Sequence, residues 1–157
     1  MYDVDVGEAE GAIPLDRGID FLEIDRDGCM RMLAAASGGV GRIALSGAPV
    51  IRPVNYAFDE RTQSVVFRSA LGSRIRGGLG SGTRAAFEID GTDAVERTGW
   101  SVIIEGEFEE VTDPAEIERL EDFELEPWAP GVKTHWVRIR ATSASGRRIV
   151  HDINYYS

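Results

Sequence analysis

The sequence predicts a mainly β protein with flanking helices, in which six strands form an antiparallel barrel. Short segments that alternate apolar and polar residues recur along the chain, and polar turns separate most of them. Helix signatures occur at only two places. Because parallel strands need a crossover helix after nearly every strand, the sheet is expected to be antiparallel.

The chain has 157 residues, a length that fits a single domain with one core. Residues 1–19 show no persistent periodicity, and we expect them to form a flexible N-terminal arm. The remaining residues, 20–157, are expected to form the barrel domain.

The first helix is expected over 25–37, where Asp25 can cap the first turn. Its apolar side chains recur at helical spacing on one face, at Met30, Leu33 and Ala34. Two strands follow, over 39–46 and 49–58, and Gly47-Ala48 between them indicates a hairpin. A polar turn then leads to a third strand over 64–69.

Two strands with one polar and one apolar face are expected over 83–90 and 99–111. Asp113 can cap a second helix, with Pro114 at its first position and Glu116 three residues after the cap. Alternation resumes over 133–151, where a last strand is expected to close the sheet.

Composition and charge exclude several classes of function. The formal net charge is −10 and Lys133 is the only lysine, so an acidic surface would repel nucleic acid. No apolar run approaches the ~20 residues of a membrane helix, and the acidic N-terminal segment leads us to expect no export. Cys29 is the only cysteine, so no internal disulfide can form, and we expect a cytoplasmic protein.

A basic island interrupts this acidic chain. No Asp or Glu occurs from Arg61 to Phe87, although the segment holds five arginines, at 61, 68, 74, 76 and 84. A strand that ends in a Gly- and Ser-rich loop and enters a short helix, over 74–79, has the parts of a phosphate cradle. The alternative is that these arginines pair with the acidic segment 105–126 as ordinary surface.

The order of elements and three segments carry a resemblance to a known family. These segments are RPVNY (52–56), FRSALGSR (67–74) and TGWSVIIEGEFEEVTDP (98–114). From Asp25 to Ile149 the chain resembles the pyridoxamine 5′-phosphate oxidase-like superfamily of split β-barrels, especially its small actinobacterial-type members. The resemblance implies a homodimer that binds FMN at its interface and acts as an oxidoreductase on a small molecule.

The resemblance also implies which residues bind the cofactor. The strand along the flavin ring would supply Arg52, Pro53, Val54, Asn55 and Tyr56. The phosphate would be held by the end of the third strand and the loop after it, at Arg68, Ser69, Ser73 and Arg74. The partner subunit would contribute Trp100 and Ser101. The outward face of the last strand would wall the site with Trp136 and Arg138.

Other readings of these residues remain open. Trp100 and Trp136 can equally be core residues, and Asn55 is expected to bond either a turn or the flavin edge. Pro53 implies a bulge or an unpaired backbone group. His135 and His151 are expected to be surface or hydrogen-bonding residues, because no ligand stands at metal spacing beside them. No catalytic residue is assigned.

The tail SGRRIVHDINYYS lacks the Arg-x-His substrate motif of true pyridoxamine phosphate oxidases, so vitamin B6 oxidation is not expected. Related barrels bind the deazaflavin F420, reduce biliverdin or bind haem. The alternatives are therefore an F420-dependent reductase, which would use Arg76 and Arg84, or a non-catalytic flavin or haem carrier. For an enzyme, a nicotinamide cofactor is the expected electron donor.

Overall fold

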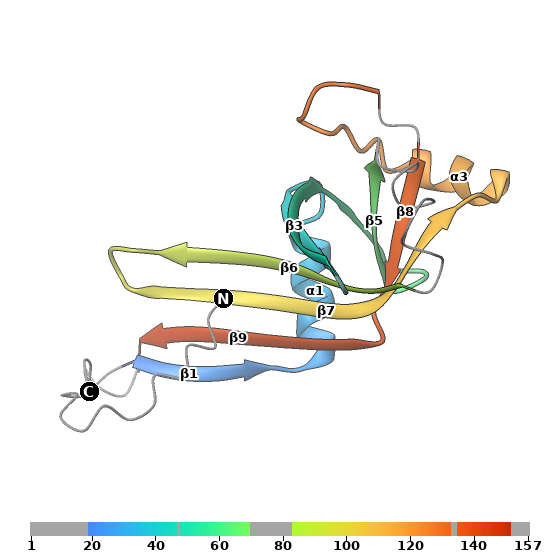
Figure 1. Ribbon diagram of the computed structural model, residues 1–157. Helices are drawn as coiled ribbons and strands as arrows, with labels where there is room; N and C mark the ends of the chain where they lie inside the picture. Colours follow the sequence, from blue (N-terminus) through green and yellow to red (C-terminus); the bar gives the residue numbers. More distant parts are fainter. Residues whose placement is uncertain (1–18, 47, 70–82, 133–134, 152–157) are drawn as a thin grey trace.

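The computed structural model describes residues 19–46, 48–69, 83–132 and 135–151 (Figure 1). Ser73, Arg74 and the short helix expected over 74–79 lie outside these residues. In chain order the described elements are β1 (Ile19–Ile24), α1 (Arg26–Ala35), β2 (Val40–Leu45), β3 (Ala48–Asn55), β4 (Ala57–Asp59), β5 (Ser64–Ser69), β6 (Thr83–Asp93), β7 (Thr98–Val111), α3 (Pro114–Glu121), β8 (His135–Arg140) and β9 (Ser143–His151).

The described strands form one antiparallel sheet in the order β3-β2-β6-β7-β8-β5-β4, and β9 pairs with both β7 and β1. Strands β3 and β5 approach each other without pairing, which leaves the barrel split there. The predicted class, a mainly β antiparallel split barrel with flanking helices, is confirmed. The predicted number of six strands is wrong, because the described residues form nine.

The three additional strands are one that was not predicted and two that arise where contacts with other parts of the chain break an expected strand. Strand β1 lies at the start of the expected domain, where no strand was predicted. The expected strand 49–58 breaks at Tyr56, whose backbone N–H and C=O bond the turn after α1, at Gly39 and Gly38. The expected strand 133–151 breaks at Ala141 and Thr142, whose N–H groups bond Gln63 and Glu105.

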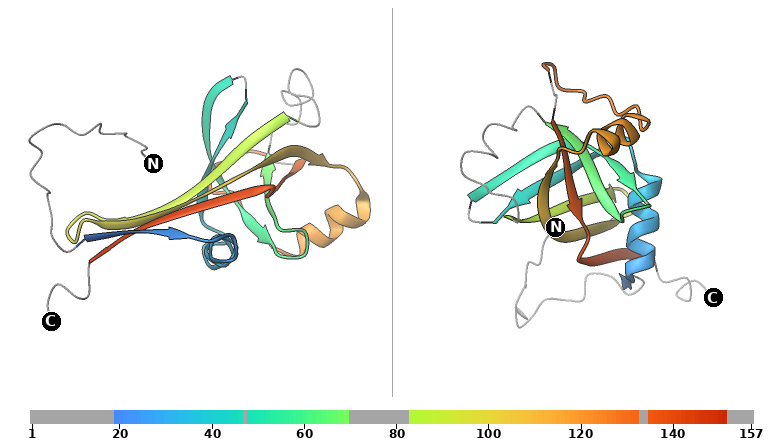
Figure 2. Two further views of the ribbon diagram at one scale, coloured as in Figure 1. Left: turned by 90° about the horizontal axis from the view of Figure 1, so that it is seen from below. Right: turned by 90° about the vertical axis from the view of Figure 1, so that its right-hand side faces the viewer.

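The long strand β7 belongs to two parts of the molecule. Its C-terminal part, Phe108 to Val111, pairs with β8 in the barrel, whereas Gly99 to Glu105 pairs with β9. Strands β6, β7, β9 and β1 thereby extend beyond the barrel as an arm (Figures 1 and 2). We call this four-stranded extension the sheet arm.

The barrel interior is filled by large side chains from the sheet and from α1. The rings of Tyr56 and Phe87 meet edge to face, with centroids 4.9 Å apart. Gly41 on β2 leaves room for this pair, because a Cβ there would lie 2.1 Å from the Phe87 ring. Helix α1 buries Cys29 and Leu33 against the same core, and burial raises the pKa of the Cys29 thiol. Its expected cap is confirmed, since Asp25 accepts a bond from the Gly28 N–H.

A second apolar cluster lies on the outer face of β5 and β8, beneath α3. The cluster includes Val66, Leu120 and Trp136. The expected cap of α3 is confirmed, because the Asp113 carboxylate accepts a bond from the Glu116 N–H. Trp136 and Arg138 lie on the outward face of β8, as expected, but α3 and the chain after it cover both side chains to 3% exposure. Neither described helix is long and apolar enough to cross a bilayer.

Candidate functional site

The free edge of β3 and the nearby end of β5 bring together several of the predicted cofactor-binding residues. Strand β3 ends the sheet, so its outer edge has no strand partner among the described residues. Arg52 and Pro53 are exposed along this edge. A proline cannot donate a backbone hydrogen bond, so its place on an unpaired edge follows from its chemistry.

The register of β3 against β2 separates the predicted residues onto two faces. Arg52 lies opposite the core residue Ile43, so Arg52 and Val54 share the inner face of the barrel. Pro53 and Asn55 project from the outer face. Tyr56 is not brought to this edge, because its ring is in the core and its hydroxyl donates to the Leu33 carbonyl at 2.8 Å. Burial raises the pKa of this phenol.

Asn55 is a buried amide that is only half satisfied. Its side chain is 9% exposed, and its Oδ1 accepts a bond from the Trp128 N–H at 2.9 Å. The expectation that Asn55 bonds a turn is therefore correct for one end of the amide. Its Nδ2 has no hydrogen-bond partner among the described residues. A buried donor without a partner costs stability, which makes a ligand acceptor at this position favourable.

Arg68 lines a hollow with a cavity volume of about 740 Å³. It faces Trp136 across β5 and β8, and its guanidinium carbon is 5.8 Å from the centre of the indole ring. The rest of the hollow is lined by Leu125 and three glutamates, Glu121, Glu124 and Glu126. Among the described residues, no carboxylate forms an ion pair with Arg68, and the recorded contact of its guanidinium is with the Trp136 ring.

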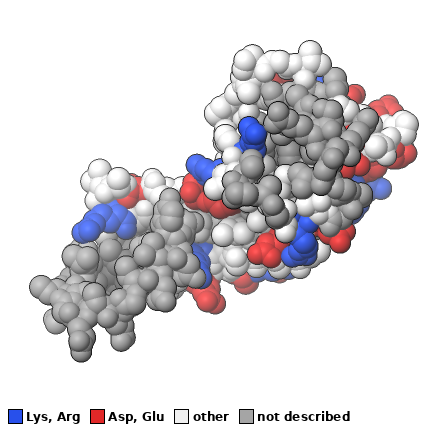
Figure 3. Space-filling view, viewed as in Figure 1, with Lys and Arg blue, Asp and Glu red and all other residues white. Residues whose placement is uncertain are grey.

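Two arginines of the basic island behave differently. Arg84 pairs with Glu105 at 3.3 Å on an exposed surface, as the surface interpretation predicts. Arg68 forms no ion pair with a carboxylate in the described part of the chain, and its role in a phosphate cradle stays a prediction. On the face of the molecule in Figure 3, basic side chains lie beside acidic ones, without a continuous basic patch on the described part of it.

Ser69 projects from the face of β5 opposite to Arg68. The two residues are neighbours in the strand, so Ser69 points inward while Arg68 points out beneath α3. Ser69 is buried and lies directly across from His135, the first residue of β8. The two side chains that were predicted to face one phosphate therefore flank the end of β5 from both sides.

Trp100 and Ser101 lie on the sheet arm and not beside β3. Trp100 packs over Gly91, where a Cβ would come within 2.7 Å of the indole nitrogen. It also contacts the edge of the core, so it has a structural role in its own chain. Within one chain the structure does not bring the pair to Asn55 and Arg68.

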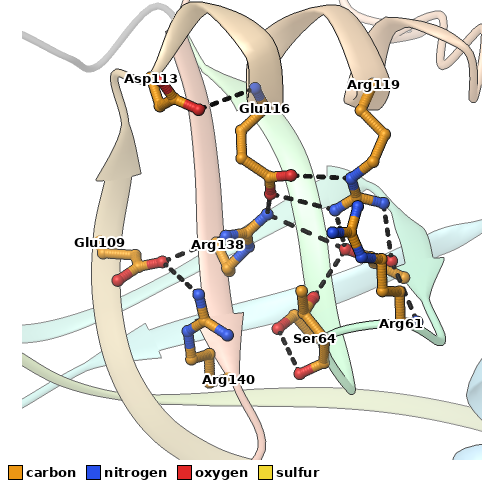
Figure 4. Close-up of polar contacts among 10 residues, drawn as sticks. Arg61, Ser64, Glu109, Asp113, Glu116, Arg119, Arg138 and Arg140 are labelled. Atoms are coloured by element: carbon orange, nitrogen blue, oxygen red, sulfur yellow. Dashed lines mark hydrogen bonds and ion pairs between the residues drawn. The ribbon is translucent and has the colours of Figure 1, made fainter.

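Arg138 belongs to a buried ion network and not to the hollow (Figure 4). Its guanidinium contacts Glu116 of α3 and lies 3.9 Å from Asp59. Arg119 joins the same carboxylates, at 2.6 Å to Asp59 and 2.8 Å to Glu116. Burial alone would raise the pKa of Asp59, but bonds from Arg119 and Thr62 outweigh it and lower that pKa. The network joins α3 to the barrel.

Sequence reasoning missed the residues that are far away in the sequence but contact the candidate site in the structure. Trp128 binds Asn55 across 73 residues, and the three glutamates of the hollow are surface residues by pattern. Glu110 accepts a bond from His135 at 2.7 Å, a contact set by the register of β7 against β8. No local sequence pattern predicts such contacts.

The sequence profile of the pyridoxamine 5′-phosphate oxidase family matches residues 25–148. Rv0080 of Mycobacterium tuberculosis is 35% identical over 138 residues, which cover 85% of this chain and 88% of that protein. The structure of an FAD binding protein from Mycobacterium smegmatis is 32% identical, with a TM-score of 0.66, over 81% of this chain and 97% of that one. A Corynebacterium glutamicum crystal structure is 26% identical, with a TM-score of 0.69, over 85% of this chain and 95% of that one. This chain therefore belongs to the pyridoxamine 5′-phosphate oxidase family.

Proposed function

We propose that this protein is a flavin-nucleotide-binding oxidoreductase that acts on a small molecule as a homodimer. FMN is the proposed cofactor, and a nicotinamide nucleotide is the proposed electron donor. Vitamin B6 oxidation is not part of the proposal, because the C-terminal substrate motif is absent from the sequence.

The observation that carries the proposal is a pair of unused donors near the split in the barrel. Among the described residues, the Nδ2 of Asn55 is buried without a hydrogen-bond partner, and the guanidinium of Arg68 forms no ion pair with a carboxylate. A flavin ring presents carbonyl and nitrogen acceptors, and its phosphate presents anionic oxygens. Both donors therefore suit this ligand, and a bound flavin would satisfy the amide that the chain leaves unpaired.

The relatives support a flavin cofactor, and the two flavin nucleotides to be compared are FMN and FAD. The Mycobacterium smegmatis relative is an FAD binding protein, and FAD contains the whole of FMN. Arg68 and Ser69, together with Ser73 and Arg74 of the following loop, are the proposed phosphate ligands. Three glutamates around Arg68 would oppose a larger polyanion in the hollow, which favours the shorter FMN tail.

A bound flavin would supply hydride or electron transfer, and the residues of the chain bind and orient it. Arg52 to Val54 would run along the ring, Asn55 would donate to its edge, and Trp136 would hold the Arg68 side chain in place. Trp100 and Ser101 would reach the site only from a second subunit, and the sheet arm is a feature that such a subunit could present. Arg138 would act indirectly, by fixing α3 over the hollow.

A titration with FMN, FAD, riboflavin and F420, followed by flavin fluorescence and absorbance, tests the proposal. The decisive variant is Asn55→Asp, which keeps an oxygen for the Trp128 N–H and removes the donor. We expect about tenfold weaker flavin binding, since a charged acceptor replaces a donor. An exposed Asp90→Asn change is the matched control, with unchanged binding expected.

Three results would count against the proposal. No binding of FMN or FAD by the parent protein would refute it, and tight binding of F420 alone would favour the deazaflavin reductase. Tight flavin binding without turnover of nicotinamide or artificial acceptors would favour a carrier. Sedimentation of the FMN complex as a monomer would remove the homodimer from the proposal.

A further inference from the structure

Ser69, His135 and Glu110 form a polar cluster at the end of the barrel where β5 and β8 meet. All three side chains project from the inner face, above the core residues Phe67 and Val137. Ser69 and His135 are direct cross-strand neighbours, a position in which Cβ atoms lie about 5 Å apart. Polar groups so close to a core need a structural or functional reason.

Glu110 fixes the hydrogen positions on the imidazole. The Nδ1 of His135 lies 2.7 Å from the Glu110 Oε1, and a carboxylate can only accept. Nδ1 therefore carries a hydrogen, so a neutral His135 has a bare lone pair at Nε2. Nε2 becomes a donor only when the ring is protonated. Among the described residues, Nε2 makes no hydrogen bond.

We propose that His135 is a pH-gated ligand for the phosphate group of the cofactor, working beside Ser69. This inference rests on the proposed function, in which Ser69 faces that phosphate. As imidazolium, His135 offers phosphate a charged Nε2–H. As neutral imidazole locked by Glu110, it presents a lone pair that repels phosphate oxygens.

The charged groups around His135 decide how its protonation responds to pH, and Glu110 is the one in contact with it. On the inner faces of the flanking strands β5 and β7, Glu110 is the one charged side chain near His135 among the described residues. Arg68 and Glu109 belong to the same two strands but project from the opposite face. An imidazolium binds phosphate more tightly than a neutral imidazole does, so affinity for the phosphate should fall as the pH rises.

The experiment measures FMN and riboflavin affinity from pH 5.5 to 8.5 by flavin fluorescence. Riboflavin lacks the phosphate, so the ratio of the two affinities isolates the phosphate contribution. We expect this ratio to fall about tenfold with rising pH in the parent protein, the loss of one charge-assisted bond. In His135→Gln the ratio should change much less, because only the titration of the phosphate itself remains.

Two further variants keep the inference falsifiable. Glu110→Gln keeps the side-chain size but releases the tautomer, so neutral His135 can carry its hydrogen on Nε2 and the pH dependence should become shallower. His151→Gln is the matched control, because His151 also contacts a carboxylate, Glu96 at 3.2 Å, but on the sheet arm. It should keep the parent profile. Thermal melts establish that each variant is folded.

The outcomes separate this inference from the function on which it rests. A parent profile retained by His135→Gln would overturn the role of His135 and leave flavin binding intact. An unchanged pH dependence in Glu110→Gln would overturn the tautomer lock. A parent protein that binds neither FMN nor riboflavin would overturn both this inference and the proposed function.

Discussion

The Arg138 guanidinium donates to the Glu116 carboxylate and so joins β8 to the first turn of α3 (Figure 4). Arg138 is buried, and of its two other carboxylate neighbours Asp59 is also buried, whereas Glu109 is partly exposed. This pairing helps to hold the outward face of β8 beneath α3. The arginine is retained in an apolar setting because its charge is matched there.

Replacing Arg138 with Met should therefore destabilise the fold. Methionine keeps much of the side-chain length but leaves Glu116 and Asp59 with one cation, Arg119, between them. Breaking a buried pair from one side costs about 3 kcal/mol, and we expect a loss of that order in urea unfolding. Arg140→Met is the control, because Arg140 is half exposed and contacts Glu109 only at 3.5 Å. Equal stability of the two variants would contradict a structural role for the network.

Glu116 and Glu88 have opposite pKa shifts, so we expect them to affect the stability of the fold in opposite ways as the pH changes. Bonds from Arg119 and Arg138 lower the pKa of Glu116 from its ordinary 4.5 to about 2. A depressed pKa means stability that is present above pH 4.5 and is lost as the pH falls toward 2. Burial and the neighbouring Asp90 instead raise the pKa of Glu88, so ionised Glu88 opposes folding at neutral pH.

Glu116→Gln should consequently lower stability at pH 7 and flatten its decline between pH 4.5 and 2. Glu88→Gln should raise stability at pH 7, because one Glu88 oxygen is buried without a described partner, and should lose that advantage in acid. Chemical unfolding at pH 7, 4 and 3 measures both signs in one series. A shift of the same sign for both variants would show that net charge, and not these local contacts, sets the acid response.

The parts of the fold that could be predicted are those specified within a few residues. Asp25 and Asp113 each bond an N–H three residues ahead, so their helices could be located from sequence alone. The break at Tyr56 could not, because it depends on backbone bonds to the turn after α1. The burial of Trp136 could not be predicted either, because it depends on α3, which follows β7 and not the strand β8 that carries Trp136.

The candidate site shows the same division. Pro53 on an edge without a described strand partner agrees with the unpaired backbone group that RPVNY predicts, whereas phosphate binding by the basic island stays a prediction. The half-satisfied amide of Asn55 depends on Trp128, and the cluster at His135 depends on the register of two strands. Tertiary contacts, which no periodicity encodes, decide which polar side chains are left without partners.

Arg68→Met tests whether the charge in the hollow binds the cofactor phosphate. The methionine stem should still pack on Trp136, so stability should change by less than about 1 kcal/mol while the cation is removed. FMN should then bind about tenfold more weakly, whereas riboflavin should be unaffected, because only FMN carries the phosphate. Arg84→Met removes a charge that Glu105 already neutralises on the surface, and its FMN affinity should match the parent. Equal losses in both arginine variants would mean that general surface charge attracts the nucleotide, and equal losses for FMN and riboflavin would place Arg68 beside the ring.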